Sequence, residues 1–287
     1  MTYLVIGASG AQGGAVAARL AAQGHRVRGY GRSGRVPYGV EPFLGDLGDP
    51  AALKAALAGV RRVSLTLPMV FGAATVAAYA AALAEALVGA SVERVVFNLA
   101  NRVPERASGV AAFTTRRAAV ETLTAAGVPL VVLRPPVYLD NLGAPWVRGP
   151  LLSEGVLRYP LPAELAVGWL SHHDLGVLTA AALTRDGLEG ARLDLGGPEA
   201  LTGPELAALF GARYEAQDPA AFTAALDALT SGTAGDGISV GAAVGDTYRW
   251  AASDPGFYLP DPGVAERLGV KLTPAGEWVA AQPWARR

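Results

Sequence analysis

The chain has no cysteine and only two lysines, Lys54 and Lys271, among its 287 residues. The lack of cysteine excludes disulfides, thiolate nucleophiles and metal sites built on thiolates. Histidine is scarce too, with His25, His172 and His173. The last two are adjacent, so on a strand they would point to opposite faces. A site in which several histidines bind one metal is therefore not expected.

A strong net charge and a long apolar run are also missing. The net charge is −1 and the isoelectric point is about 6.3, so no surface for nucleic acid or an anionic membrane is predicted. Residues 63–84 carry no charge, but Pro68 and Gly72 interrupt them, which favours a buried strand and a packed helix over a membrane span. The N-terminus lacks the basic segment of a signal peptide. We expect a soluble, cytoplasmic protein.

The first 135 residues alternate short β-branched runs with longer alanine-rich segments. This pattern is typical of an α/β fold of Rossmann type, a doubly wound parallel sheet covered on both faces by helices. Helices are expected near 12–23, 50–58, 73–88 and 110–126, and the Asp49-Pro50 pair supplies a start signal for the second. The predicted strands are Tyr3–Ile6, Arg26–Tyr30, Pro42–Leu44, Arg62–Leu67, Arg94–Asn98 and Leu130–Leu133.

After residue 137 the rhythm changes, and four prolines in 138–170 predict loops and a small lobe. A helix near 174–184, capped by Asp174, and a strand near Ala191–Leu195 return to the first pattern. Thr202 and Glu205 form a capping box that opens another helix. We therefore predict a cofactor domain from 1–137 and 171–198, and a smaller substrate-pocket lobe from 138–170 and 199–287. Residues 231–259, rich in glycine, serine and aspartate, could not be placed.

The turn after the first strand has the spacing G-x-x-G-x-x-G and leads into a helix. Glycines at this spacing let the backbone turn tightly and approach a pyrophosphate, which the free N–H groups of the helix N-terminus bind. The predicted dinucleotide-binding residues of this turn are Gly7, Ser9, Gly10, Ala11, Gln12 and Gly13.

The end of the second strand indicates which dinucleotide is bound. An NAD site usually has a carboxylate here, but this chain has no acid and instead has Arg32, 19 residues beyond Gly13. A guanidinium binds a 2′-phosphate through two hydrogen bonds, each worth roughly 1.5–3 kcal/mol when charged. We therefore predict NADP(H).

Besides the glycine turn, several segments match one known family: GYGRSGR (29–35), GDLGDPAALKAALAGV (45–60), VERVVF (92–97), RRAAVETLTAAGVPLVVLRPPVYLDN (116–141), SHHDLG (171–176) and GGPEALTGPELA (196–207). Together they resemble the NmrA-like family of atypical short-chain dehydrogenases/reductases. The resemblance implies that Asp46 and Leu47 pass near the adenine, and Leu67 and Pro68 near the nicotinamide.

Short-chain reductases typically pair a proton-donating tyrosine with a lysine four residues later. The resemblance implies that NmrA-like relatives often lose the tyrosine, and that several keep the lysine four residues ahead of a glutamate. With Glu121 as the reference, the lysine position holds Arg117 and the tyrosine position holds Phe113. Phenylalanine has no proton to donate, and arginine stays protonated at neutral pH. The usual pair is therefore absent.

Three functions remain open. The chain could reduce an electron-poor acceptor such as a quinone or enone, which needs little acid catalysis, with Arg117 holding the nicotinamide ribose or stabilising negative charge. The acid could instead have moved to Tyr138, which with Asn141 follows the sixth strand and would line the pocket. Alternatively, the chain is a non-catalytic NADP(H) sensor with a regulatory protein partner. A homodimer also stays open.

Overall fold

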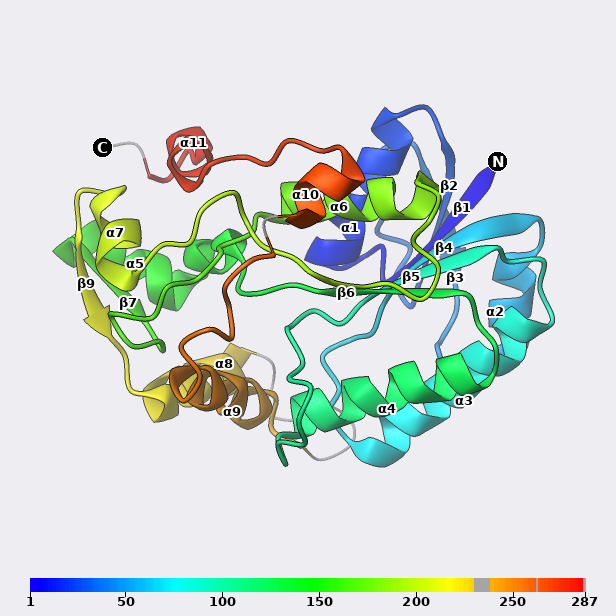
Figure 1. Ribbon diagram of the computed structural model, residues 1–287, viewed down its shortest axis with the longest axis horizontal. Coiled ribbons are helices and arrows are strands. Elements are labelled where there is room, and N and C mark those ends of the chain that lie inside the picture. Colours follow the sequence, from blue (N-terminus) through cyan, green and yellow to red (C-terminus); the bar gives the residue numbers. More distant parts are fainter. Residues whose placement is uncertain (230–237, 262, 286–287) are drawn as a thin grey trace.

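The computed structural model describes residues 1–229, 238–261 and 263–285, and centres on a seven-stranded parallel sheet. The strand order is β3-β2-β1-β4-β5-β6-β8, so the order reverses between β1 and β4 (Figure 1). In doubly wound sheets, ligands bind at the carboxyl ends of the strands beside such a reversal. The strands are β1 (Thr2–Ile6), β2 (Arg26–Gly31), β3 (Val40–Leu44), β4 (Val60–Thr66), β5 (Arg94–Asn98), β6 (Leu130–Arg134) and β8 (Arg192–Asp194).

Helices cover both faces of this sheet, as the near-continuous apolar strands require. All five residues of β5 are buried, and so are the first four of β6. On one face lie α1 (Ala11–Ala22), α6 (His172–Thr184) and α10 (Gly263–Leu268); on the other lie α2 (Pro50–Leu57), α3 (Ala73–Val88) and α4 (Ala111–Ala125) (Figure 1). The predicted α/β fold of Rossmann type is confirmed.

A smaller group of elements lies beyond the carboxyl ends of the strands, on the left in Figure 1. It has its own parallel pair of strands, β7 (Val156–Tyr159) and β9 (Arg213–Ala216). The other elements are the 3-10 helix η1 (Leu139–Gly143), α5 (Pro145–Glu154), α7 (Gly203–Ala208), α8 (Pro219–Leu229), α9 (Val240–Ala252) and α11 (Ala275–Ala281). Strand β8 rejoins the large sheet, while the exact limits of the two domains stay a prediction.

Local signals place most helix ends. Asp49 caps α2 by accepting hydrogen bonds from the N–H groups of Ala51 and Ala52, and Thr202 and Glu205 form the expected capping box at α7. Gly24, which follows α1, has φ of 79°, a left-handed conformation that favours glycine.

Two local predictions were wrong. Ser171, not Asp174, caps α6, because its Oγ accepts from the Asp174 N–H at 3.0 Å. The proline-rich residues 138–170 contain helix as well as loop, since Pro145 occupies the first position of α5, where a missing N–H costs nothing. For residues 231–259 the sequence predicted no structure. Of these, 231–237 lie outside the described residues, and α9 occupies 240–252. No described helix is long and apolar enough to cross a membrane.

Candidate functional site

The turn between β1 and α1 is packed so tightly that two of its positions require glycine. A Cβ on Gly13 would lie 2.3 Å from the carbonyl oxygen of Gly7, and one on Gly7, whose φ is 88°, would lie 2.9 Å from that of Thr66. Gly10 caps α1 without a side chain, and the first turn holds no acidic residue. The amide groups at the start of α1 are therefore suited to an anion.

The predicted adenosine-binding residues lie at the end of β2. A Cβ on Gly31 would be 3.1 Å from Ser9 Oγ, so Ser9 lies against the strand end that Arg32 follows. Arg32 is exposed, and its guanidinium has no hydrogen bond or ion pair with any described residue. The buried Tyr30 donates to the Asp46 carbonyl oxygen at 2.7 Å, which brings Asp46 and then Leu47 to the same end of the sheet.

A cavity of about 510 Å³ opens at the carboxyl ends of β4, β5 and β6, beside the glycine turn. Its walls come from α4, from the segment after β6, and from α8 and α9. Apolar side chains make much of the lining, among them Leu67, Phe71, Leu99, Val137, Trp146 and Phe222. Among the residues that the structure describes, only Arg116 and Asp140 bring ordinarily charged groups to it.

Arg116 is 3% exposed and projects from α4 to this cavity. Its guanidinium donates to the carbonyl oxygens of Pro68 at 2.7 Å and Val70 at 3.1 Å, and lies 5.3 Å from the ring centre of Phe71. Burial lowers its pKa to about 10. At pH 7 the charged form still predominates by about a thousand to one. The cavity thus contains a fixed cation bonded to neutral carbonyl groups.

Arg117, which the sequence predicts beside the nicotinamide, does not line this cavity. Its guanidinium donates to the carbonyl oxygens of Pro104, Glu105 and Arg106, beside a small pocket of about 60 Å³ with a mixed polar and apolar lining. Phe113 is 1% exposed and packs in the core.

The cavity face of α4 instead carries Ala112 and Arg116, four residues apart. These two belong to a buried stripe that continues through Ala119 and Leu123. The helical period of that stripe predicts that Arg116 faces the interior, where the cavity lies. Counting back four residues from Glu121 selects Arg117 instead.

Tyr138 and Asn141 both line the cavity. The Tyr138 hydroxyl donates to Gln12 Oε1 at 3.2 Å, and burial raises its pKa well above that of free tyrosine. Asn141 donates to the Tyr159 hydroxyl at 3.2 Å, which lies 2.7 Å from the Tyr248 hydroxyl. Since the Tyr138 proton already has an acceptor and no cation lowers its pKa, this tyrosine is a weak acid.

His172 and Asp174 have structural contacts. The backbone N–H of His172 donates to Asp140 Oδ2 at 2.7 Å. The centre of the His172 ring lies 4.7 Å from that of the Tyr138 ring. Asp174 accepts from the N–H and the hydroxyl of Thr273, both at 3.0 Å, and so fastens the segment between α10 and α11 to α6. The described residues include no cluster of histidine and acidic side chains that could hold a metal.

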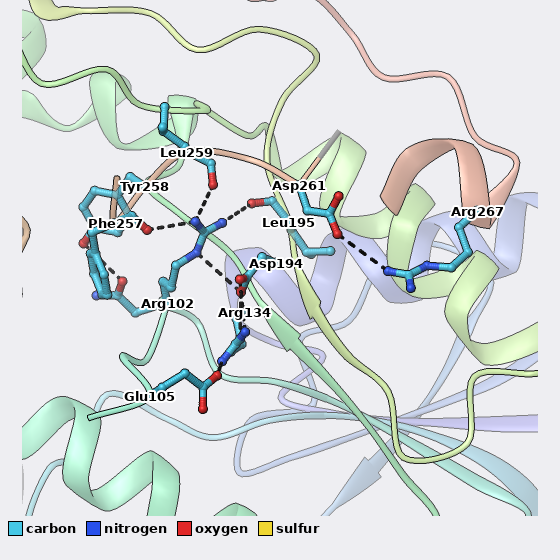
Figure 2. A network of polar contacts seen from close by, with 11 residues as sticks. Arg102, Glu105, Arg134, Asp194, Leu195, Phe257, Tyr258, Leu259, Asp261 and Arg267 are labelled. Atoms are coloured by element: carbon cyan, nitrogen blue, oxygen red, sulfur yellow. Dashed lines mark hydrogen bonds and ion pairs between the residues drawn. The ribbon is translucent and has the colours of Figure 1, made fainter. Parts of the chain in front are cut away.

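Arg102 fastens one cavity wall and was not found by sequence reasoning. Figure 2 shows its guanidinium among backbone carbonyl groups: it donates to Phe257 and Leu195 at 2.8 Å each, and to Leu259. Asp194 lies 3.6 Å from Arg102 Nε and also pairs with Arg134. These contacts hold residues 257–259 against the loop after β5.

The same arrangement positions Tyr258 at the cavity. Its hydroxyl donates to Asn101 Oδ1 at 3.2 Å, and both residues line the cavity. No motif marks Arg102, since its hydrogen-bonding partners are carbonyl groups distant in the chain.

Comparison with known proteins places this architecture in a family. Residues 1–223 match the NmrA-like family. The chain belongs to it. The family is one of atypical short-chain dehydrogenases/reductases within the Rossmann NAD(P)-binding superfamily, so the resemblance drawn from the sequence is confirmed.

Two curated relatives are reductases. The chain is 35% identical over 208 residues, 70% of each protein, to the (4-alkanoyl-5-oxo-2,5-dihydrofuran-3-yl)methyl phosphate reductase of Streptomyces griseus. It is 28% identical over 177 residues to the NAD(P)H azoreductase of Xenophilus azovorans, which covers 61% of this NmrA-like chain and 58% of that protein.

Solved structures share the fold over nearly the whole chain. The NADPH-dependent quinone oxidoreductase QOR2 of Escherichia coli, complexed with NADPH, superposes with a TM-score of 0.73 at 23% identity and covers 98% of this chain and 99% of its own. The negative transcriptional regulator NmrA, in complex with NADP, gives a TM-score of 0.73 at 16% identity with 99% of both chains covered.

Proposed function

We propose that this NmrA-like protein is an NADPH-dependent reductase of small, electron-poor acceptors, of the quinone or conjugated enone class. The observation that carries the proposal is a largely apolar cavity at the sheet reversal that contains a buried arginine but, among the described residues, no side chain suited to donate a proton readily. Membership of a family with reductases among its members supports the same conclusion.

The residues at the glycine turn fit an NADP(H) molecule. The uncapped start of α1 would bind the pyrophosphate through backbone N–H groups, and the unpaired Arg32 at the end of β2 would bind the 2′-phosphate. Leu67 and Pro68, at the end of β4, and Gln12, at the start of α1, would lie on the nicotinamide side, where the cavity opens.

Replacing Arg32 with alanine tests the choice of cofactor. Loss of a charge-assisted contact to the 2′-phosphate should weaken NADPH binding by roughly tenfold or more and leave NADH binding nearly unchanged. Fluorescence titration of both cofactors measures the two dissociation constants. An unchanged ratio between them would contradict the assignment. Arg35→Ala, three residues away in the same exposed loop, is the control for a general loss of positive charge.

The cofactor supplies a hydride, and this chain supplies the surroundings of the acceptor. Addition of a hydride to a quinone or an enone breaks a C=O or C=C π bond and leaves a negative charge on the acceptor oxygen, which a proton from water then neutralises. Arg116 would stabilise this charge as it develops, since a buried cation held by two carbonyl groups acts without reorganisation. The apolar lining would hold the ring of the acceptor.

Tyr138→Phe separates this proposal from a relocated acid. A general acid contributes roughly 10²–10⁴-fold to the rate. The Tyr138 proton is already bonded to Gln12, so we expect its loss to lower kcat less than tenfold, mostly through the loosened Gln12 side chain. Steady-state rates with one quinone decide the matter. A hundredfold loss would make Tyr138 the proton donor.

Oxidation of NADPH in the presence of a panel of quinones and enones tests the function itself. Turnover with several members of the panel is expected. Micromolar binding of NADPH without turnover of any acceptor would contradict the reductase and favour a second function, a redox sensor that binds NADP(H) and acts through a protein partner. The observation that favours the sensor is the lack of the usual tyrosine and lysine. Phe113 and Arg117 stand at their positions in the sequence, and the cavity face of α4 carries Ala112 and Arg116.

A further inference from the structure

Three connected hydrogen bonds fix the orientation of the Gln12 amide. Asn98, the last residue of β5, accepts from the N–H of Ala100 through Oδ1 at 2.9 Å. Its other amide atom, Nδ2, must therefore face away from Ala100, and it donates to Gln12 Oε1 at 2.8 Å. The Tyr138 hydroxyl donates to the same oxygen at 3.2 Å. Both donors hold the Gln12 carbonyl group, so its orientation is determined.

The backbone at Ala100 supports this arrangement. Its φ is 60°, in the left-handed region that residues other than glycine seldom adopt. A side-chain oxygen that accepts from the N–H two residues later forms a turn and stabilises such a conformation. Unusual backbone of this kind often occurs at functional sites. Ala100 and Gln12 both line the cavity.

The fixed carbonyl group leaves the Gln12 amino group, Nε2, with two donor hydrogens and no partner among the described residues. Gln12 lies in the first turn of α1 but extends toward the ends of β5 and β6. These strands lie on the opposite side of the reversal from β2, where Arg32 and Ser9 mark the adenosine end. The amino group is therefore on the side of the sheet where the nicotinamide would lie.

We propose that Gln12 Nε2 donates a hydrogen bond to the carboxamide oxygen of the nicotinamide, and that Asn98 and Tyr138 are positioning residues that set the orientation of its amide. The inference rests on the proposed cofactor. Its consequence is that the nicotinamide, rather than the pyrophosphate, is the part of the cofactor that Gln12 binds. The backbone amides of the same helix turn remain free for the pyrophosphate.

The test compares two ligands that differ by the nicotinamide: NADPH, and 2′-phospho-ADP-ribose, which keeps the adenosine, the pyrophosphate and the 2′-phosphate. Calorimetric titration gives both dissociation constants without an acceptor. Gln12→Met keeps the length of the side chain and removes the donor. We expect NADPH to bind about five- to tenfold more weakly, as for one lost hydrogen bond, and 2′-phospho-ADP-ribose to bind as before.

Asn98→Asp tests the orientation while Gln12 stays intact. A carboxylate can still accept from Ala100, but its second oxygen cannot donate to Gln12. The Gln12 amide should then rotate and present its carbonyl group to the nicotinamide, so NADPH should again bind more weakly relative to the fragment. The added charge acts on phosphates that both ligands share, and the ratio of the two constants removes its effect.

Two results would overturn the inference. One is an equal loss of both ligands in Gln12→Met, which would assign Gln12 to the pyrophosphate. The other is a wild-type ratio in Asn98→Asp. Circular dichroism and the melting temperature establish that each variant is folded. Because no turnover is measured, a failure to reduce quinones would count against the proposed reductase alone.

Discussion

Replacing Arg116 with methionine should lower kcat with a quinone by roughly 100- to 1000-fold, the usual cost of removing one group that stabilises a developing oxyanion. The reason is its position: Arg116 is a buried cation at a largely apolar cavity, tied to neutral carbonyl groups. Among the residues that the structure describes, none forms an ion pair with it, and Asp140, the other charged residue at the cavity, accepts a hydrogen bond from the backbone N–H of His172. The decrease of NADPH absorbance with time measures the rate, and KM should change far less than kcat.

Arg117→Met is the matched control, because it removes the same side chain one position along α4 and outside the cavity. It should retain most of its kcat. Arg116→Lys should recover part of the rate, since it restores the charge but not both carbonyl contacts. If Arg116→Met kept kcat within tenfold of wild type, or if lysine were as poor as methionine, Arg116 would have no electrostatic role in the reaction.

The pH dependence follows from the same residue. Burial lowers the pKa of Arg116 to about 10, so the guanidinium is charged throughout the neutral range. Its contribution is fully present below that pKa and is lost as the pH rises through about 10. No bell-shaped profile near pH 7 is expected if hydride transfer limits the rate.

The sheet and its helices were predictable because each depends on local signals. Apolar runs, caps and terminal glycines indicated every strand from β1 to β6. The edge strand β3 was predicted too short, since only its first residue is buried and its exposed residues carry a weak pattern. The smaller lobe was harder: Pro145 and Pro150 obscured α5, and β7 pairs with β9 across more than fifty residues of chain.

In the candidate site, too, the features that depend on local sequence could be predicted and those that depend on distant residues could not. The glycine turn could be found because its function depends on consecutive residues and on backbone geometry that glycine alone permits. The hydrogen-bonding partner of Tyr138 could not be predicted, because Gln12 lies 126 residues earlier and only the fold brings the two residues together. Arg102 binds carbonyl groups, which every residue has, so its partners leave no trace in the sequence.

Gly13→Ala should abolish tight cofactor binding, and the geometry of the turn gives the reason. The new methyl group would lie 2.3 Å from the carbonyl oxygen of Gly7 and 2.6 Å from its carbon, both backbone atoms that cannot move independently of the turn. Displacement of the turn would misplace at least two N–H groups meant for the pyrophosphate, each worth roughly 1.5–3 kcal/mol, so NADPH should bind at least about 100-fold more weakly.

The same overlap should lower the stability of the protein, since overpacking costs about 1–3 kcal/mol and a chain of this size loses roughly 2–4 °C of Tm per kcal/mol. Gly14→Ala is the matched control, because its methyl group would meet only the Ala8 carbonyl oxygen, at 3.3 Å, and alanine favours a helix. Calorimetric titration and thermal unfolding distinguish the two variants. Tight NADPH binding by Gly13→Ala would mean that the cofactor does not use this turn.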